Sequence, residues 1–227
     1  TWCAEALARS GVGALTLADL DHIAESNINR QVHALDSTVG QSKVQAMAAR
    51  IGDINPQCRV RCIDDFVDAE NVEQLFGDGV GVLVDCTDQV PAKVAMVLAA
   101  RSHGRPVIVC GGAGGKTDPL ALRAGDLSVA VHDALLGRVR QVLRKHHAYP
   151  KGGAQGGKAH RRVPRMGVQC LWFDQPVILP EQWLEGAEPT APQGLSCAGY
   201  GSMVTVTAGM GMSAAHLALT QLLMPRR

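Results

Sequence analysis

No two of the seven cysteines stand in a C-x-x-C pair, so the chain has neither the ligand spacing of a zinc ribbon nor an obvious disulfide framework. A reducing cytoplasm is the simplest setting for these thiols. The net charge is also close to zero, at +1, which excludes a protein whose whole surface is basic and binds nucleic acid. The chain also opens without a charged-then-apolar signal segment, and Thr1-Trp2-Cys3 has the character of an internal stretch, so we expect the natural N-terminus to lie upstream.

A long uninterrupted apolar run is likewise missing. The one membrane-like stretch, residues 203–224, is broken by threonines, a histidine and a glutamine, and it contains Gly209 and Gly211. We therefore expect a closely packed helix of a soluble core and no membrane association.

Apolar runs alternate with helical patterns along the 227 residues, an order typical of the α/β class. We predict a doubly wound, Rossmann-like, mostly parallel sheet with helices on both faces and a C-terminal extension. Strands are expected at 14–18, 58–63, 80–84 and 106–110, and helices at 4–9, 41–54, 69–76, 91–102 and 135–145. One domain, 1–227, would comprise a nucleotide-binding half (1–125) and a C-terminal half (126–227) with a basic, flexible segment at 146–165.

Polar residues follow the first expected strand, at the end where parallel sheets place their ligands. Asp19 and Asp21 can accept hydrogen bonds from a ribose, although a solvated loop acid fits them equally well. Arg30 and Lys43 can offset the charge of a triphosphate, which would otherwise repel an incoming carboxylate. Asn27 can orient phosphate or ribose oxygens. These residue types favour an ATP site.

A second polar stretch, Asp85-Cys86-Thr87-Asp88, follows the expected strand at 80–84. Magnesium prefers oxygen ligands, usually one or two carboxylates together with waters and phosphates. Asp85 can alternatively cap the next helix. Cysteines 58, 62, 86, 110 and 170 are expected to be buried small hydrophobes, and His33 is expected at the surface or at a cap.

Three motifs then appear in a fixed order: D-x-D at 19–21, N-x-x-R-Q at 27–31 and G-x-x-K at 40–43. This order resembles the ATP site of the ubiquitin-activating-enzyme-like adenylating superfamily. Segments such as I-N-P-Q-C-R-V, G-G-A-G-G-K-T-D-P and G-Y-G-S-M-V-T-V-T resemble the tRNA threonylcarbamoyladenosine dehydratases. The resemblance implies that ATP activates the threonyl carboxylate as an adenylate, and that ring closure then releases AMP. It also implies that a glycine-rich phosphate turn precedes Thr1.

The same resemblance implies roles for individual residues. Catalysis would depend on Arg30, Lys43 and Asp88, with Asp88 as the Mg²⁺ ligand. ATP contacts would come from Asp19, Asp21, Asn27, Arg30, Gln31 and Lys43, and a substrate loop would contain Gly112, Gly114, Gly115 and Cys197. A monovalent cation is a further candidate at this loop. The implied partners are tRNA, a second copy of the chain in a homodimer, and a sulfur-transfer protein.

The stretch from Arg138 to Arg165 contains nine lysines and arginines and no acidic residue. We expect it to contact tRNA phosphates, through Lys158, Arg161, Arg162 and Arg165. A solvated loop whose charge only aids solubility is the alternative for this stretch.

Three alternative functions remain for the whole chain. An activator of a ubiquitin-like sulfur carrier would share the ATP site, but such proteins commonly carry two C-x-x-C pairs. A nicotinamide oxidoreductase would leave S-N-I-N-R-Q unexplained. A non-catalytic tRNA-binding module would be supported by the basic stretch alone.

Overall fold

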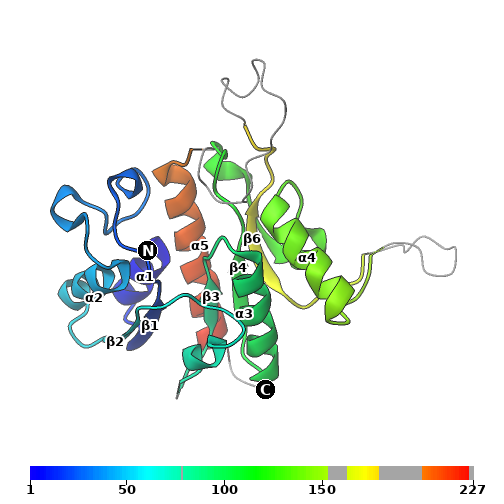
Figure 1. Ribbon diagram of the computed structural model, residues 1–227, viewed down its shortest axis with the longest axis horizontal. Helices are drawn as coiled ribbons and strands as arrows, with labels where there is room; N and C mark the ends of the chain where they lie inside the picture. Colours follow the sequence, from blue (N-terminus) through cyan, green and yellow to red (C-terminus); the bar gives the residue numbers. More distant parts are fainter. Residues whose placement is uncertain (78, 153–162, 179–200, 225–227) are drawn as a thin grey trace, which may run out of the picture.

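The computed structural model describes residues 1–227 except 78, 153–162, 179–200 and 225–227 (Figure 1). The helices are α1 (Trp2–Arg9), α2 (Lys43–Ile54), α3 (Val90–Ser102), α4 (Ala134–His146) and α5 (Val204–Leu223). The strands are β1 (Ala14–Ala18), β2 (Arg59–Ile63), β3 (Leu83–Asp85), β4 (Val107–Cys110), β5 (Leu122–Asp126) and β6 (Gln169–Phe173). The alternation of strands and helices confirms the α/β class.

The strands of the described residues form two sheets. Strands β1 and β2 pair in parallel, from Ala14 opposite Arg59 to Ala18 opposite Ile63. The other sheet has the order β3-β4-β6-β5, in which the first three strands are parallel and β5 runs antiparallel to β6. The prediction of mostly parallel pairing is confirmed, but the strands are divided between two sheets.

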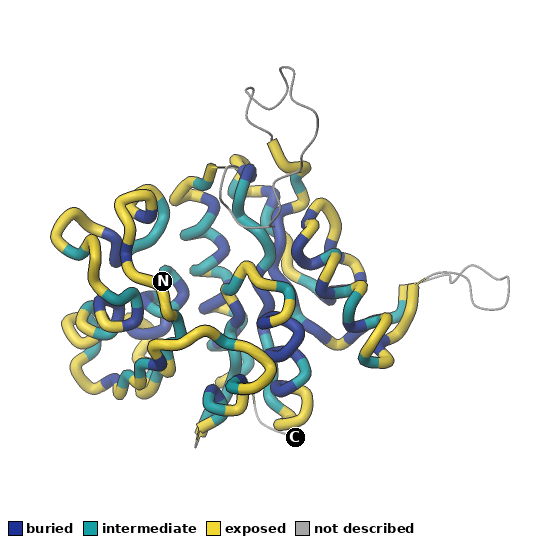
Figure 2. The backbone as a smooth tube through the Cα atoms, viewed as in Figure 1, coloured by how far each residue is buried: buried dark blue, intermediate teal, exposed yellow. Residues whose placement is uncertain are grey.

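Helices cover both faces of the four-stranded sheet, because successive side chains of a strand point to opposite faces. On β4, Val109 packs with α3 and α4, whereas Ile108 and Cys110 pack with α1 and α5. Strand β6 divides its residues in the same way. Figure 2 shows the result: β4 and β6 are dark blue in the middle of the molecule, and the segment between β1 and α2 is mostly exposed. The predicted helix layers on both faces are therefore confirmed.

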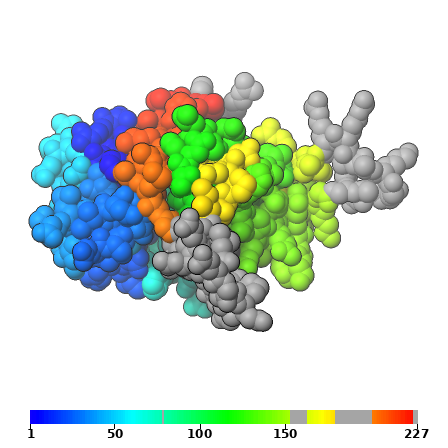
Figure 3. Space-filling view, turned by 90° about the horizontal axis from the view of Figure 1, so that it is seen from above, coloured from blue at the N-terminus to red at the C-terminus, as the bar shows by residue number. Residues whose placement is uncertain are grey.

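Helix α5 packs closely on α1, and Gly211 allows the approach. A Cβ atom at Gly211 would lie 2.7 Å from the Cβ of Trp2, closer than two carbon atoms can pack. In the view from above, the start of α5 (orange) lies between the blue N-terminal region and the green middle of the chain (Figure 3). In the part of the chain that the structure describes, no helix has the length and apolarity needed to cross a membrane.

Two predicted elements differ from the observed ones, and one observed strand was not predicted. Strand β3 begins at Leu83 rather than at Val80, because the N–H of Val80 donates to the carbonyl of Gly77 in a turn. The helix expected at 69–76 is only a short 3-10 turn, Val72–Leu75. Strand β5 was not predicted, since Leu122–Asp126 contains a glycine and two charged residues and lacks an apolar run.

Candidate active site

A cavity of about 320 Å³ opens where β1, β3 and β4 end. Asp19 follows β1, residues 86–88 follow β3, and residues 111–114 follow β4, and all of them line the cavity. Its remaining wall includes residues of α1 and α5, among them Trp2, Thr207 and Met210. Open parallel sheets place their ligands at this edge, so the cavity is the candidate active site.

Arg30 and Gln31 line the cavity from the segment between β1 and α2. The Arg30 carbonyl is fixed by Trp2 Nε1 (2.9 Å) and by Thr207 Oγ1 (3.0 Å), which join this segment to α1 and α5. Nη1 of Arg30 donates to the Ser26 carbonyl at 2.6 Å. The buried Oε1 of Gln31 accepts no hydrogen bond from the described residues. An unsatisfied buried acceptor is costly, so Gln31 is suited to meet a donor on a ligand.

Asp19, Asp21 and Lys43 are joined beside the cavity. Lys43, the first residue of α2, pairs with Asp21 at 2.6 Å, and the N–H of Asp21 donates to Asp19 Oδ1 at 2.9 Å. Burial raises the pKa of Asp19 above its usual range, although the hydrogen bond from the N–H of Asp21 and the nearby charge of Lys43 offset part of this rise. Only Asp19 of the three lines the cavity.

Asn27 does not line the cavity either. Its side chain is buried, and Oδ1 accepts the N–H of Ala24 at 3.1 Å, which closes the short turn of Glu25–Asn27. This contact fixes the segment that carries Arg30.

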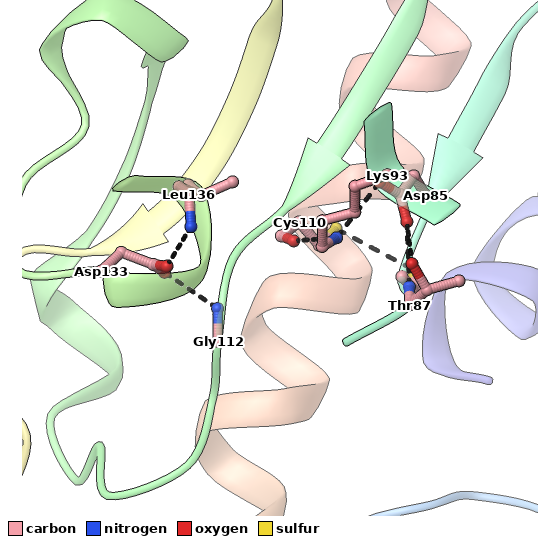
Figure 4. A network of polar contacts seen from close by, with 8 residues as sticks. Asp85, Thr87, Lys93, Cys110, Gly112, Asp133 and Leu136 are labelled. Carbon is pink, nitrogen blue, oxygen red and sulfur yellow. Dashed lines mark hydrogen bonds and ion pairs between the residues drawn. The ribbon is translucent and has the colours of Figure 1, made fainter. Parts of the chain in front are cut away.

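The two acids of the D-C-T-D stretch have different surroundings. Asp88 is exposed and lines the cavity, and its Oδ1 accepts a hydrogen bond from Gln89 Nε2 at 3.3 Å. Asp85 is fully buried and pairs with Lys93 of α3 at 3.2 Å, as Figure 4 shows. Asp85 also accepts the N–H and hydroxyl of Thr87, at 3.0 and 2.8 Å, and it does not cap α3, whose N-cap is Gln89.

Cys86 does not have the expected buried position: it is exposed and lines the cavity. Its Sγ lies 3.9 Å from that of Cys110, and the hydrogen bond between the thiols lowers the pKa of Cys86 to about 7. Residues 85 and 109 are paired across β3 and β4, so the next positions lie side by side at the strand ends. His33 also differs from expectation, because it is 3% exposed.

The loop Gly111–Gly115 is shaped by contacts that require glycine. A Cβ at Gly111 would lie 2.1 Å from Asp133 Oδ2, and the N–H of Gly112 donates to that oxygen at 2.9 Å. Asp133 also caps α4 by accepting the N–H of Leu136 (Figure 4). Gly112 and Gly114 line the cavity, whereas Gly115 is buried with φ +66.

Several residues at or beside the cavity were missed from the sequence: Lys93, Lys116, His132, Asp133 and Asp174. They come from separate segments with no motif spacing between them. The sequence signals were the place of Lys116 within the G-G-A-G-G-K-T-D-P segment and the position of Asp133 just before the predicted basic helix, which is typical of a cap. Of the predicted site residues, Cys197, Lys158, Arg161 and Arg162 lie outside the described residues. Arg165 is described and exposed. The site thus brings together Asp19, Arg30, Gln31, Asp88, Gly112 and Gly114.

The chain is similar along nearly its whole length to known proteins. A family model described as the ThiF family matches residues 1–225. The tRNA threonylcarbamoyladenosine dehydratase of Escherichia coli is 36% identical over 230 residues, covering 98% of this chain and 82% of that protein. The enzyme of the same description from Haemophilus influenzae is 37% identical, covering 98% and 81%.

Solved structures agree with these relatives. The crystal structure of Escherichia coli tRNA N6-threonylcarbamoyladenosine dehydratase in complex with ATP has a TM-score of 0.81 and 34% identity, covering 98% of this chain and 80% of that chain. A structure of the same protein in complex with AMP gives the same values. The family match over nearly every residue, together with the shared fold, shows that this chain belongs to the ThiF family.

Proposed function

We propose that this chain is an ATP-dependent tRNA threonylcarbamoyladenosine dehydratase. One observation carries the proposal: the cavity at the strand ends unites Asp19, Arg30 and Asp88 in a chain similar over 98% of its length to dehydratases of that name. Structures of one such relative are complexes with ATP and with AMP, the substrate and product expected of an adenylating enzyme.

The proposed reaction has two steps. A carboxylate oxygen of the threonyl group bonds to the α-phosphorus of ATP, the bond from that phosphorus to the bridging oxygen breaks, and pyrophosphate leaves. An internal nucleophile of the threonylcarbamoyl group then attacks the activated carbonyl carbon, and AMP leaves with the electron pair of the broken C–O bond. Water is removed in effect, and the reaction requires no covalent bond to the protein.

The protein's part is to position the reactants and offset charge. Arg30 lies in the cavity wall, and Lys43 pairs with Asp21, whose N–H donates to the cavity-lining Asp19. Both cations would stabilise the negative charge that builds up on the α-phosphate. Asp19 and Gln31 would hold the nucleotide by hydrogen bonds, while Asn27 would support the segment from within.

Asp88 is suited to bind a magnesium ion whose other ligands are phosphate oxygens of the substrate. Its exposed carboxylate lines the cavity, and magnesium is commonly held by one or two carboxylates plus substrate phosphates and waters. The ion would offset phosphate charge during adenylation. Asp88→Asn keeps the side-chain shape but removes the charge, so we expect it to abolish magnesium-dependent turnover while the melting temperature stays unchanged. Wild-type turnover in the variant would remove Asp88 as a ligand.

The basic stretch from Arg138 to Arg165 would bind tRNA phosphates. Arg138 and Lys145 are exposed on α4, whereas Arg140 donates to the carbonyls of Leu127 and Ala130 and so supports the fold. The double variant Arg138→Ala/Lys145→Ala should weaken tRNA binding and reduce its logarithmic salt slope by about 0.7 per lost phosphate contact. The matched control is Arg59→Ala/Arg123→Ala, which removes two exposed arginines from strands β2 and β5. If the two double variants bind tRNA with the same affinity and the same salt dependence, Arg138 and Lys145 do not contact tRNA.

The decisive experiment for the proposed function combines two assays. ATP–pyrophosphate exchange is measured with threonylcarbamoylated tRNA and with unmodified tRNA, and the nucleoside product is identified by its mass. We expect exchange with the modified tRNA alone, and a product lighter by one water molecule. Exchange stimulated instead by a small sulfur-carrier protein, with no change in the nucleoside, would replace this function by sulfur-carrier activation.

A further inference from the structure

His132 lies in the wall of the cavity, although adenylation as described above gives it no part. Its Nδ1 is 2.9 Å from Oδ1 of Asp174, which follows β6 directly. A carboxylate only accepts hydrogen bonds, so this contact places the proton of a neutral imidazole on Nδ1. Nε2 then carries the free lone pair. The pair therefore has the geometry in which a carboxylate orients a histidine for proton transfer.

The pair is held by a buried lysine. Lys116 is 3% exposed, and its Nζ donates to the carbonyls of His132 (2.8 Å) and Gln175. One ammonium group thus fixes the backbone beside both members of the pair. Burial lowers the pKa of Lys116, while the charges of Asp133 and Asp174 raise it. Among the described residues, Asp174 and Lys116 are charged groups that contact His132, and Asp133 is its neighbour along the chain.

Further contacts fix the backbone around His132 and Asp174. Oε1 of Gln175 accepts the N–H groups of Thr117 (3.0 Å) and Asp118 (3.1 Å), which joins the segment after β6 to the end of the glycine loop. His132 has φ +54, in the left-handed region that costs free energy for a side chain with Cβ. Such a conformation persists where surrounding contacts enforce it. Lys116 and Asp174 supply these contacts on the two sides of His132.

Ring closure requires a base, and this inference rests on the proposed function. When the internal nucleophile bonds to the activated carbonyl carbon, AMP leaves with the C–O electron pair, and a proton must leave the nitrogen of the threonylcarbamoyl group. We propose that Nε2 of His132 is the base that accepts this proton, and that Asp174 is the positioning residue that orients the ring. Lys116 holds the two together, and the imidazolium formed returns its proton to solvent.

A second histidine–carboxylate pair provides a matched control. Nε2 of His103 lies 2.6 Å from Oε2 of Glu73, and its ring stacks on Phe76 with the centroids 4.4 Å apart. Both pairs join an imidazole to a carboxylate and are partly exposed, but neither His103 nor Glu73 lines the cavity. Any effect confined to His132 therefore depends on its position at the cavity.

The test measures the two half-reactions separately in His132→Asn and His103→Asn. Asparagine is chosen because it tolerates the left-handed backbone at residue 132. In His132→Asn we expect ring closure in a single turnover to slow by about 100-fold, the usual size for loss of a general base. Acyl-adenylate should accumulate, because the step that consumes it is slowed. His103→Asn should close the ring at the wild-type rate.

Two further readouts separate a base from a structural role. Added imidazole should restore ring closure in His132→Asn, since a free base can enter the emptied position, and it should leave the wild-type rate unchanged. In the wild-type protein, the rate of ring closure should rise with pH, because only a neutral imidazole can accept the proton. This rise should be absent in His132→Asn. In Asp174→Asn it should occur over a different pH range.

Each result decides between the two proposals. If wild-type protein shows no exchange with threonylcarbamoylated tRNA, the proposed function fails independently of His132. If exchange is normal and His132→Asn closes the ring within about twofold of the wild-type rate, His132 is not the base. If His132→Asn does not fold, as shown by its thermal melt, Asp174→Asn decides: an unchanged pH profile in that variant contradicts the inference.

Discussion

Two aspartate–lysine pairs in this molecule have the same chemistry and opposite surroundings. In each, the aspartate lies at or just beyond the end of a strand and the lysine lies on the helix that follows. Asp21 and Lys43 are 2.6 Å apart, with side chains 57% and 11% exposed, whereas Asp85 and Lys93 are 3.2 Å apart and wholly buried. Lys43 can leave Asp21 and pair with a ligand, because water solvates the exposed carboxylate. Lys93 cannot leave Asp85 without leaving an unpaired charge in the core. The first is therefore suited to binding and the second to holding the fold.

The largest expected effect comes from breaking the buried pair. Lys93→Met leaves the Asp85 carboxylate without its cation, so we expect the free energy of unfolding to fall by about 3–5 kcal/mol. Lys93 Nζ also donates to the Cys110 carbonyl at 2.7 Å, and that contact is lost as well. Urea unfolding measures the change.

The control for this prediction removes both charges. Asp85→Asn/Lys93→Met keeps an acceptor for Thr87 but has no buried carboxylate, so it should recover part of the lost stability. If Lys93→Met alone unfolds within about 1 kcal/mol of wild type, then the pair does not hold β3 to α3.

The next largest effect is on catalysis, and it concerns Lys43 of the exposed pair together with Arg30. Arg30→Ala and Lys43→Ala should each slow adenylation by about 100-fold, the size associated with losing one preorganised donor to developing charge. Stability should change less than in Lys93→Met, because Arg30 lies in the cavity wall and the partner of Lys43, Asp21, has a side chain 57% exposed to water. Single-turnover formation of pyrophosphate measures the rate. Unchanged rates in both variants would remove these cations from the ATP site.

This contrast shows what the sequence could and could not predict. The sequence predicted one site for Asp19, Arg30 and Asp88, and the structure places all three in the wall of one cavity. Asp19 and Asp88 follow strands whose ends converge at one edge, and Arg30 lies on the segment that continues from Asp19. The same rule could not distinguish Asp85 from Asp88. Which of two neighbouring acids turns inward depends on Lys93, eight residues after Asp85, and a lysine within an apolar helix gives no local sign of that partner.

Some strands of the fold could be predicted from the sequence and others could not. Strands with continuous apolar runs, such as β4, were found, because their pattern reflects burial on both faces. Strand β5 was missed, since its partner β6 lies more than 40 residues further along the chain and supplies the packing that Leu122–Asp126 lacks by itself. The His132–Asp174 pair was missed for the same reason: it is assembled by Lys116 from three distant segments.

The smallest expected effect is the loss of the exposed pair's own contribution to stability. Asp21→Asn removes the charge that faces Lys43, and an exposed ion pair contributes at most about 1 kcal/mol because water and salt screen it. We expect the free energy of unfolding to fall by less than that, and the difference from wild type to shrink as salt is added. The N–H of Asp21 donates to Asp19 through the backbone, so this contact survives the substitution. Urea titrations at low and high salt measure both values. A loss comparable with that of Lys93→Met, insensitive to salt, would mean that the exposed pair also holds the fold, and the division of roles between the two pairs would be wrong.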